Sequence, residues 1–262
     1  MAQDADRPAY TMAGRLHDYS SARLHSHDLH QFLTILDGVS LLETEHHRSP
    51  LYGAMCAFIP ASCRHRSLAV GKDIAYQSLY LPVKDMPKRG AAYAPSQTNA
   101  IVVFNLSELS AALFNRIAAS DRHALQEGIA KSCLRLFLKT AMEDMEHLTF
   151  ELRLPSPRTE AGIRIAAHLE AHFTEEIGLA RIQKDLPYSS RHAVRLFTAD
   201  LGITPAAYLR IYRLFQASVL LRGSAKSVTE IALDCGYTSL SSFYTDFKNH
   251  FGSTPRHFRG EG

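Results

Sequence analysis

The sequence predicts a two-domain α+β protein, with a β-barrel and flanking helices in its N-terminal part and an all-α domain at its C-terminus. Short strand-like segments separated by turn residues fill residues 30–82, whereas helical periodicity runs almost without a break beyond residue 160. A proline-rich segment separates the two patterns. At 262 residues, 46% of them hydrophobic, the chain is long enough to form two hydrophobic cores.

The N-terminal β-structure is predicted from alternating apolar segments that end at turn signals such as Asp37-Gly38 and Ser49-Pro50. Short strands at such regular spacing are typical of a barrel or a sandwich, and we expect this domain to cover residues 1–106. The predicted strands are Gln31 to Leu36, Val39 to Glu43, Met55 to Ile59 and Ile74 to Leu81.

Two helices are predicted over residues 107–150, which either cover an edge of the barrel or form a dimer seam. Their apolar residues recur at helical spacing: Leu109, Leu113 and Ile117, then Leu125, Ile129, Cys133, Leu136 and Phe137. The segment 151–160 contains RLPSPR, whose two prolines disfavour helix, so it is predicted to be a linker. Residues 161–262 then form the C-terminal domain.

An internal repeat is the strongest signal in this C-terminal domain. Five residues recur fifty positions later in the chain: Ser189, Phe197, Gly202, Thr204 and Pro205 match Ser239, Phe247, Gly252, Thr254 and Pro255. Each copy reads as a short helix, a tight turn, a Ser-capped helix, a Gly stop and a Thr-Pro restart, which is the pattern of a helix-turn-helix unit.

The second copy allows the parts of this unit to be assigned. Ala232 is small enough for a close helix crossing, Gly236 can take the positive φ that ends the first helix, and Ser239 caps the second helix. The apolar anchors of that second helix are Phe243, Phe247 and Phe251. The alternative is a helical bundle with a solvated basic face, which would not explain why the caps and the turn are duplicated.

The charge distribution favours a nucleic-acid partner for this domain. Residues 181–259 contain eleven Lys or Arg against five Asp or Glu, a net charge of +6, whereas the rest of the chain has a net charge of −3. Phosphate contacts set the position of such a protein, and side chains at the front of a recognition helix read base edges. Arg191 and Arg195 are the best candidates for guanine contacts.

Two segments of the C-terminal domain resemble the DNA-binding module of AraC-family regulators. The resemblance rests on YSSRHAVRLFTADLGITPAAYLRIYRLFQASVLL and SVTEIALDCGYTSLSSFYTDFKNHFGSTPRHFR and spans about residues 160–259. It implies two recognition helices, joined by a helix from about Pro205 to Leu221, that enter successive major grooves of the duplex. The expected DNA-contacting residues are Ser190, Arg191, His192, Val194, Arg195, Ser239, Leu240, Ser241, Thr245 and Lys248.

The first unit departs from the family pattern at three positions. Gln183 and Pro187 replace the usual alanine and glycine, and Ala193 replaces leucine. Because proline cannot adopt a positive φ, the first turn must have another geometry. The resemblance further implies a bacterial transcription regulator that binds double-stranded promoter DNA, works with RNA polymerase and forms a homodimer.

Histidines in the N-terminal domain suggest a metal site. His25-Ser-His27, Gln31 and the His65 that ends PASCRH are similar to the cupin pattern, so the barrel is expected to be cupin-like. Three imidazoles and one amide oxygen suit zinc, nickel, iron or manganese. Two alternatives remain: the histidines line a metal-free cavity for a sugar or metabolite, or they satisfy hydrogen bonds of the barrel. His30, His46 and His47 are expected to be solvated loop residues.

Three functions fit these features. The first is a regulator whose activity responds to a metal or a small-molecule effector in the barrel, and the second is a constitutive regulator whose barrel only dimerises. The third, a metal-dependent cupin enzyme tethered to a DNA-binding module, needs a poised acid or base, and Asp28, Glu43 and Glu45 lack such a spacing. We therefore expect no catalytic residues.

The cellular setting is predicted from what the sequence lacks. It has no apolar run long enough to span a membrane and no secretory-type start, so we expect a cytoplasmic protein without membrane contact. The four cysteines, which include no C-x-x-C pair, are expected to be reduced and mostly buried.

Overall fold

A computed structural model describes residues 9–16, 23–53, 55–69, 74–86, 101–120, 128–147, 154–175 and 186–260. Their contacts divide the chain into two compact units. The first unit contains the described residues up to Thr44 and those from Leu51 to His147, and the second contains Glu45–Pro50 and the described residues from Leu154 onward. In the described part of the chain, no helix is both long and apolar enough to cross a bilayer.

The first unit is built on an antiparallel sheet with the strand order β1-β7-β2-β5-β8. Its strands are β1 (Tyr10–Leu16), β7 (Ile74–Pro82), β2 (Leu29–Asp37), β5 (Met55–Ile59) and β8 (Val102–Asn105). A second antiparallel ladder joins β3 (Ser40–Thr44) to β6 (His65–Ala69), and a 3-10 turn, η1 (Val83–Asp85), follows β7. This sheet-rich unit confirms the predicted β-structure, while its assignment as a cupin-like barrel stays a prediction.

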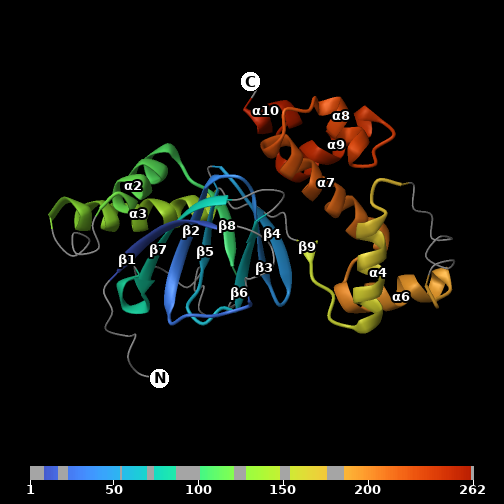
Figure 1. The fold of residues 1–262 in the computed structure, drawn as a ribbon, viewed down its shortest axis with the longest axis horizontal. Coiled ribbons are helices and arrows are strands. Elements are labelled where there is room, and N and C mark those ends of the chain that lie inside the picture. Colours follow the sequence, from blue (N-terminus) through green and yellow to red (C-terminus); the bar gives the residue numbers. More distant parts are fainter. Residues whose placement is uncertain are drawn as a thin grey trace. The chain divides into compact units, whose positions relative to one another are not determined.

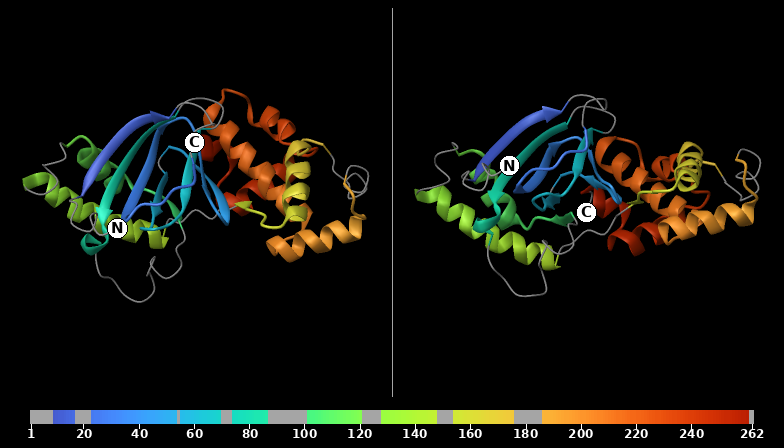
Figure 2. Two further views of the ribbon diagram at one scale, coloured as in Figure 1. Left: turned by 60° about the horizontal axis from the view of Figure 1, so that its bottom comes forward. Right: turned by 90° about the horizontal axis from the view of Figure 1, so that it is seen from below.

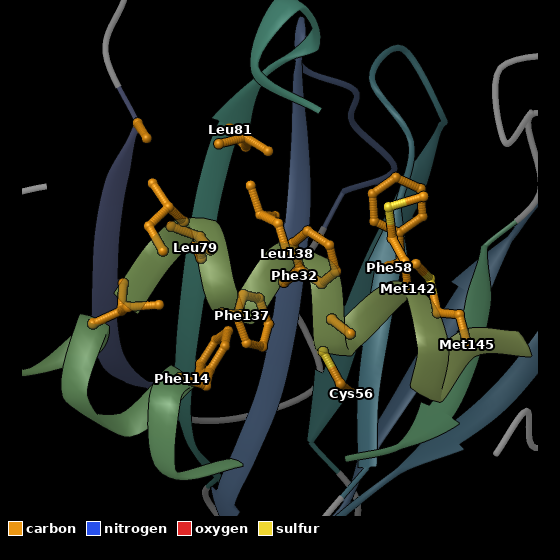
Figure 3. Packing of buried hydrophobic residues seen from close by; sticks show 14 of the residues in the cluster. Phe32, Cys56, Phe58, Leu79, Leu81, Phe114, Phe137, Leu138, Met142 and Met145 are labelled. Carbon is orange, nitrogen blue, oxygen red and sulfur yellow. The ribbon is translucent and has the colours of Figure 1, made fainter. Parts of the chain in front are cut away.

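Two helices cover one face of this sheet (Figures 1 and 2): α2 (Glu108–Ala118) and α3 (Gly128–His147). Figure 3 shows Phe114 of α2 and Phe137 of α3 packed against Phe32 and other strand residues. The predicted stripe on α2 was partly wrong, because Leu109 is 53% exposed. The buried face is instead Ser110, Phe114 and Ile117. These helices form the core of the first unit with the sheet.

Strands β2, β3, β5 and β7 lie where the sequence predicts strands. The sequence does not predict β1, β4 (His47–Leu51), β6 and β8. Ser49-Pro50 reads as a turn signal in the sequence, yet both residues are buried in β4. His30 had been expected in a solvated loop and is instead 7% exposed on β2. Its Nδ1 accepts a hydrogen bond from the Ala61 amide at 3.0 Å, and burial lowers its pKa.

The second unit is helical, as predicted. Its helices are α4 (Glu160–Ala171), α6 (Ser190–Leu201), α7 (Pro205–Gly223), α8 (Val228–Asp234), α9 (Leu240–Phe251) and α10 (Pro255–Arg259). Helix α7 lies between the pair α4/α6 and the pair α8/α9 (Figure 1). Each pair forms its own hydrophobic cluster against α7.

Helix α7 is buried on more than one side. Tyr208 and Phe215 are buried, whereas Ile211, Tyr212 and Val219 are only half-buried. Leu209, Leu214 and Leu221 are buried instead. The reason is that two separate helix pairs pack on different sides of α7, so a single apolar face does not describe it.

The predicted linker is not a free segment, which corrects the expectation for residues 151–160. Leu154–Pro155 form the short strand β9, which pairs with β4 through His47↔Pro155 and Arg48↔Leu154. Leu154 is buried in the same cluster as α4 and α6. The amides of Arg158 and Thr159 donate to the Asp200 carboxylate of α6.

Candidate nucleic-acid interface

The second helix-turn-helix unit forms because its local signals agree with one another. A capping box starts α8: the Ser227 hydroxyl accepts from the Glu230 amide, and the Glu230 carboxylate accepts from the Ser227 amide. Gly236 follows with a φ of 76°, and the Ser239 hydroxyl then accepts from the Ser242 amide to start α9. Gly252, with a φ of 71°, ends that helix. Every sequence-predicted part of this unit is therefore present.

Aromatic side chains fix the orientation of α9. Phe243 and Phe247 are fully buried, and Phe251 stacks on Phe247 with ring centroids 4.2 Å apart. Ala232 is buried where α8 packs beside them, as its small size predicts. With the inward face occupied by these residues, the opposite face of α9 is left to solvent.

The first unit repeats the same caps on α6. The Ser189 hydroxyl accepts from the His192 amide, and Gly202 ends α6 with a φ of 73°. Thr204 and Pro205 then start α7, as Thr254 and Pro255 start α10. Residues 176–185, including Gln183, lie outside the described part of the chain. Pro187 lies in the bend before α6, which contains no positive φ.

The predicted DNA-contacting side chains gather on the free faces of α6 and α9. Arg191 and Arg195 are exposed, and Arg195 Nη2 lies 3.1 Å from His192 Nδ1. On α6, Ser190, His192 and Val194 are half-buried beside them. On α9 and its cap the exposed residues are Ser239, Leu240, Ser241, Thr245 and Lys248. The Ser239 hydroxyl accepts a hydrogen bond from the Ser242 amide in the helix cap. Ser241 and Thr245 are the neighbouring exposed hydroxyl side chains.

A contact that sequence reasoning missed fixes the two helix-turn-helix units relative to each other. Arg213 of α7 donates from Nε to the Phe173 carbonyl and from Nη2 to the Glu175 carbonyl, each at 2.7 Å. The Phe173 carbonyl also faces Gly236, where an added Cβ would approach it to 2.6 Å. The end of α4 therefore packs against the turn of the second unit. No local sequence signal reports this contact, because the partners lie 38 or more residues apart.

The candidate metal residues of the first unit come together only in part. The ring centroids of His25, His27 and His65 lie 4.6 to 6.2 Å apart, and His25 pairs with His65 in an isolated bridge. His27 Nε2 lies 3.0 Å from Gln31 Oε1. Within the described ranges, however, no group of three or more His, Cys, Asp or Glu side chains has the geometry to hold a metal ion. Burial lowers the pKa of His65 to about 4, so its ring is neutral at physiological pH.

A cavity of about 440 Å³ lies beside these histidines, and eleven described residues line it. Alternation along each strand explains its position: Phe32 and Leu79 face the helices, whereas Leu33 and Ser78 face the cavity on the other side of the sheet. The volume is within the range of small-molecule sites, about 300–1,000 Å³. The lining residues are Met12, Arg23, His25, Gln31, Leu33, Ile35, Ser67, Ile74, Tyr76, Ser78 and Tyr80.

Comparisons with known proteins agree with the helical geometry. A family model described as a helix-turn-helix domain matches residues 182–261. The transcriptional activator RhaS of Shigella sonnei is 26% identical over 250 residues, which cover 90% of this chain and 86% of that protein. The chain is a DNA-binding transcription regulator with a helix-turn-helix domain. RhaS of Salmonella schwarzengrund is 38% identical over 96 residues, which cover 37% of this regulator and 34% of that protein.

The chain is also similar to proteins of solved structure. An AraC-type regulator from Chromobacterium violaceum is 33% identical, covers 38% of this regulator and 90% of its own chain, and has a TM-score of 0.37. ToxT from Vibrio cholerae O395 is 12% identical, covers 97% of each chain and has a TM-score of 0.40.

Proposed function

We propose that this regulator activates transcription and that a small molecule bound in the cavity of the first unit controls it. The observation that supports a ligand is the cavity itself, which is of small-molecule size and lies on the sheet face opposite the helices. A ligand can change DNA binding only if it binds two arrangements of the protein with different affinities. The proposed place of action is the cytoplasm, where promoter DNA lies, and no catalytic step belongs to this function.

Activation is proposed from relatives that are named as activators, and it implies contact with RNA polymerase. The experiment is transcription in vitro with purified full-length protein and polymerase. The template has a promoter beside a site selected by this protein from a random-sequence duplex pool. More transcript than from a template without the site supports activation. Less transcript identifies a repressor and contradicts the proposal.

The proposed regulator is a homodimer, with α3 as its contact surface. Ile129 is 71% exposed and Leu136 is 45% exposed on this helix, and the half-buried Cys133 lies between them at helical spacing. The other face of α3 is already packed against the sheet. The exposed apolar stripe is therefore suited to pair with the same stripe of a second copy.

A divalent metal at the histidines is the second candidate for the effector. The Nδ1 atoms of His25, His27 and His65 each donate to a backbone carbonyl, at 3.1, 2.6 and 2.9 Å, which leaves Nε2 with its lone pair. Metal-binding histidines are commonly oriented in this way. In a neutral His27 ring the Nε2 lone pair faces the Gln31 Oε1 atom, so two acceptors repel each other. A cation bound between them, or rotation of the Gln31 amide, removes this repulsion. The donor chemistry fits a metal, although the ligands are not gathered into a formed site.

Replacing His27 tests the metal directly. For His27→Ala we expect the purified protein to lose the metal that wild type contains, because one of three imidazole ligands is gone. The measurement is elemental analysis, and Arg116→Ala on the exposed face of α2 serves as the control. Equal metal content in wild type and His27→Ala, including none in either, would refute the metal.

A further inference from the structure

The charge on the described lining of the cavity indicates which ligands it suits. Among the described residues that line the cavity, Arg23 is the only one with a full charge. Arg23 is exposed and makes no ion pair with another described residue. An exposed, planar guanidinium is suited to two parallel hydrogen bonds with a carboxylate.

The rest of the lining is mainly apolar or already satisfied. Met12, Leu33, Ile35 and Ile74 provide hydrocarbon walls. The amide of Gln31 donates to the Ser78 hydroxyl at 2.9 Å, so these two polar groups satisfy each other. A sugar ring needs many free hydrogen-bonding partners, and this surface offers few of them.

Two tyrosines add neutral hydroxyl groups to the apolar walls. Tyr76 and Tyr80 both line the cavity. Tyr80 also stacks on Tyr10 with centroids 4.8 Å apart, which holds its ring in place. Neutral phenol hydroxyls can donate to an anion without repelling it.

We propose that the effector is an organic anion, a carboxylate with an aromatic or alkyl body, whose carboxylate binds Arg23. This inference rests on the proposed function, since it names the ligand class for the same cavity. The anionic group lies at the exposed Arg23, and the apolar body lies against the buried sheet face.

Pairs of probes that differ only in charge test this assignment. Phenylacetate is compared with phenylacetamide, and octanoate with octanamide, by calorimetric titration into the full-length protein. We expect each carboxylate to bind roughly tenfold tighter than its amide, the effect of about one charge-assisted hydrogen bond pair. Arg23→Gln should abolish that difference, and Arg116→Gln on α2 should keep it.

The outcomes separate the ligand class from the proposed function. Equal binding of acid and amide, no binding of any probe, or an unchanged preference in Arg23→Gln each overturns the anion assignment. A neutral hexose that binds and alters DNA affinity would overturn the assignment while leaving effector control intact. A carboxylate that binds through Arg23 without changing affinity for the selected duplex would support the assignment but contradict effector control.

Arg48 lies in a short segment that belongs to the helical unit, although in the sequence it stands between two strands of the sheet unit. Residues Glu45–Pro50 cluster with the helical unit, whereas Thr44 and Leu51 on either side belong to the sheet unit. The pairing of β4 with β9 continues in the Ser156 amide, which donates to the His46 carbonyl at 2.8 Å. A segment between two strands of the sheet unit is therefore part of the DNA-binding unit.

Arg48 binds two helices of that unit at once. Its Nη2 donates to Glu170 Oε1 of α4 at 2.5 Å and to the Tyr208 hydroxyl of α7 at 2.6 Å, and its Nη1 donates to Glu170 Oε2 at 3.3 Å. The Tyr208 hydroxyl itself donates to Glu170. The side chains of Arg48 and Glu170 are only 19% and 21% exposed, so solvent screens the pair little.

Tyr208 links this network to the first recognition helix. Its ring is fully buried and meets Phe197 of α6 edge to face, with centroids 5.2 Å apart. Phe197 is the inward anchor of the helix whose free face presents Arg191 and Arg195.

We infer that Arg48 is a positioning residue for α6, which it supports through Glu170 and Tyr208 within the helical unit. The test compares Arg48→Ala with Arg66→Ala, which removes a similar Arg–Glu pair, Arg66–Glu43 at 2.7 Å, between two strands of the first unit. For Arg48→Ala we expect roughly tenfold faster amide exchange in α6, about the effect of one lost charged hydrogen bond. Exchange in α9 should not change.

Footprinting on the selected duplex supplies the functional readout. Arg48→Ala should weaken protection of the half-site read by α6 and leave the α9 half-site protected, and Arg48→Lys should restore part of the loss. Arg66→Ala should change neither half-site. Equal losses of protection at both half-sites would overturn the positioning role, because a contact that only stabilises the whole unit affects both helices alike. No loss at either half-site would overturn it as well.

Discussion

Replacing Gly236 with alanine is expected to abolish specific DNA binding and to destabilise the helical unit by about 3 kcal/mol or more. Two costs add at this position. Gly236 has a φ of 76°, which an L-residue adopts at a cost of about 1–2 kcal/mol. A Cβ would also lie 2.6 Å from the Phe173 carbonyl and 2.9 Å from Thr174 Cα, and both contacts are with backbone, which cannot rotate away. The backbone that follows α4 would have to move away from the turn of the second helix-turn-helix unit, which contains Gly236.

Gly252→Ala is the matched control, because its φ of 71° is almost the same while no atom lies within 4 Å of an added Cβ. We expect it to lose only the conformational cost of about 1–2 kcal/mol and to keep DNA binding. Urea unfolding and gel-shift titration on the selected duplex measure both effects. Equal behaviour of the two variants would show that the contact between α4 and the second turn does not fix the geometry of the two units.

Replacing Arg195 with alanine should weaken DNA binding by about 1–3 kcal/mol, roughly 5- to 150-fold, and relax the preference at one or two base pairs. The guanidinium is exposed on the free face of α6, and its neighbour His192 lies 3.1 Å away, which limits its rotamers. Because α6 is anchored by Ala193 and Phe197 on its other face, the fold should be unaffected.

Arg116→Ala removes the same charge from α2 and so controls for the general loss of positive charge. Affinity is measured at two salt concentrations, on both the selected duplex and a scrambled one. If Arg195→Ala kept wild-type affinity and base preference, α6 could not be the helix that reads the first half-site through this residue.

Local signals explain why so much of the helical unit could be predicted from the sequence. Ser239, Gly252 and the Thr254-Pro255 pair each act on the backbone next to them, so their effect does not depend on distant residues. The same holds for Ser189 and Gly202 in the first copy. The exposed positions of α6 and α9 follow directly once these caps set the helix limits.

Features that depend on distant partners could not be predicted in this way. Pro50 reads as a turn residue, but it lies in strand β4, which pairs with β9 about a hundred residues later. His30 is buried on β2, where its ring accepts a hydrogen bond from the Ala61 amide. Arg48 finds Glu170 and Tyr208, and Arg213 finds the end of α4, only in the folded unit. The metal site at His25, His27, Gln31 and His65 stays a prediction, and among the described residues no group of three or more His, Cys, Asp or Glu side chains could hold a metal ion.

The two recognition helices of one chain should read one face of promoter DNA. Methylation protection of guanine N7 on the selected duplex, with the full-length protein, tests this most directly. We predict two protected major-groove tracts with centres about 34 Å apart, one helical turn. Arg195→Ala should remove protection from one tract only. A single protected tract, or two tracts on opposite faces of the duplex, would contradict this reading of the DNA by both helices.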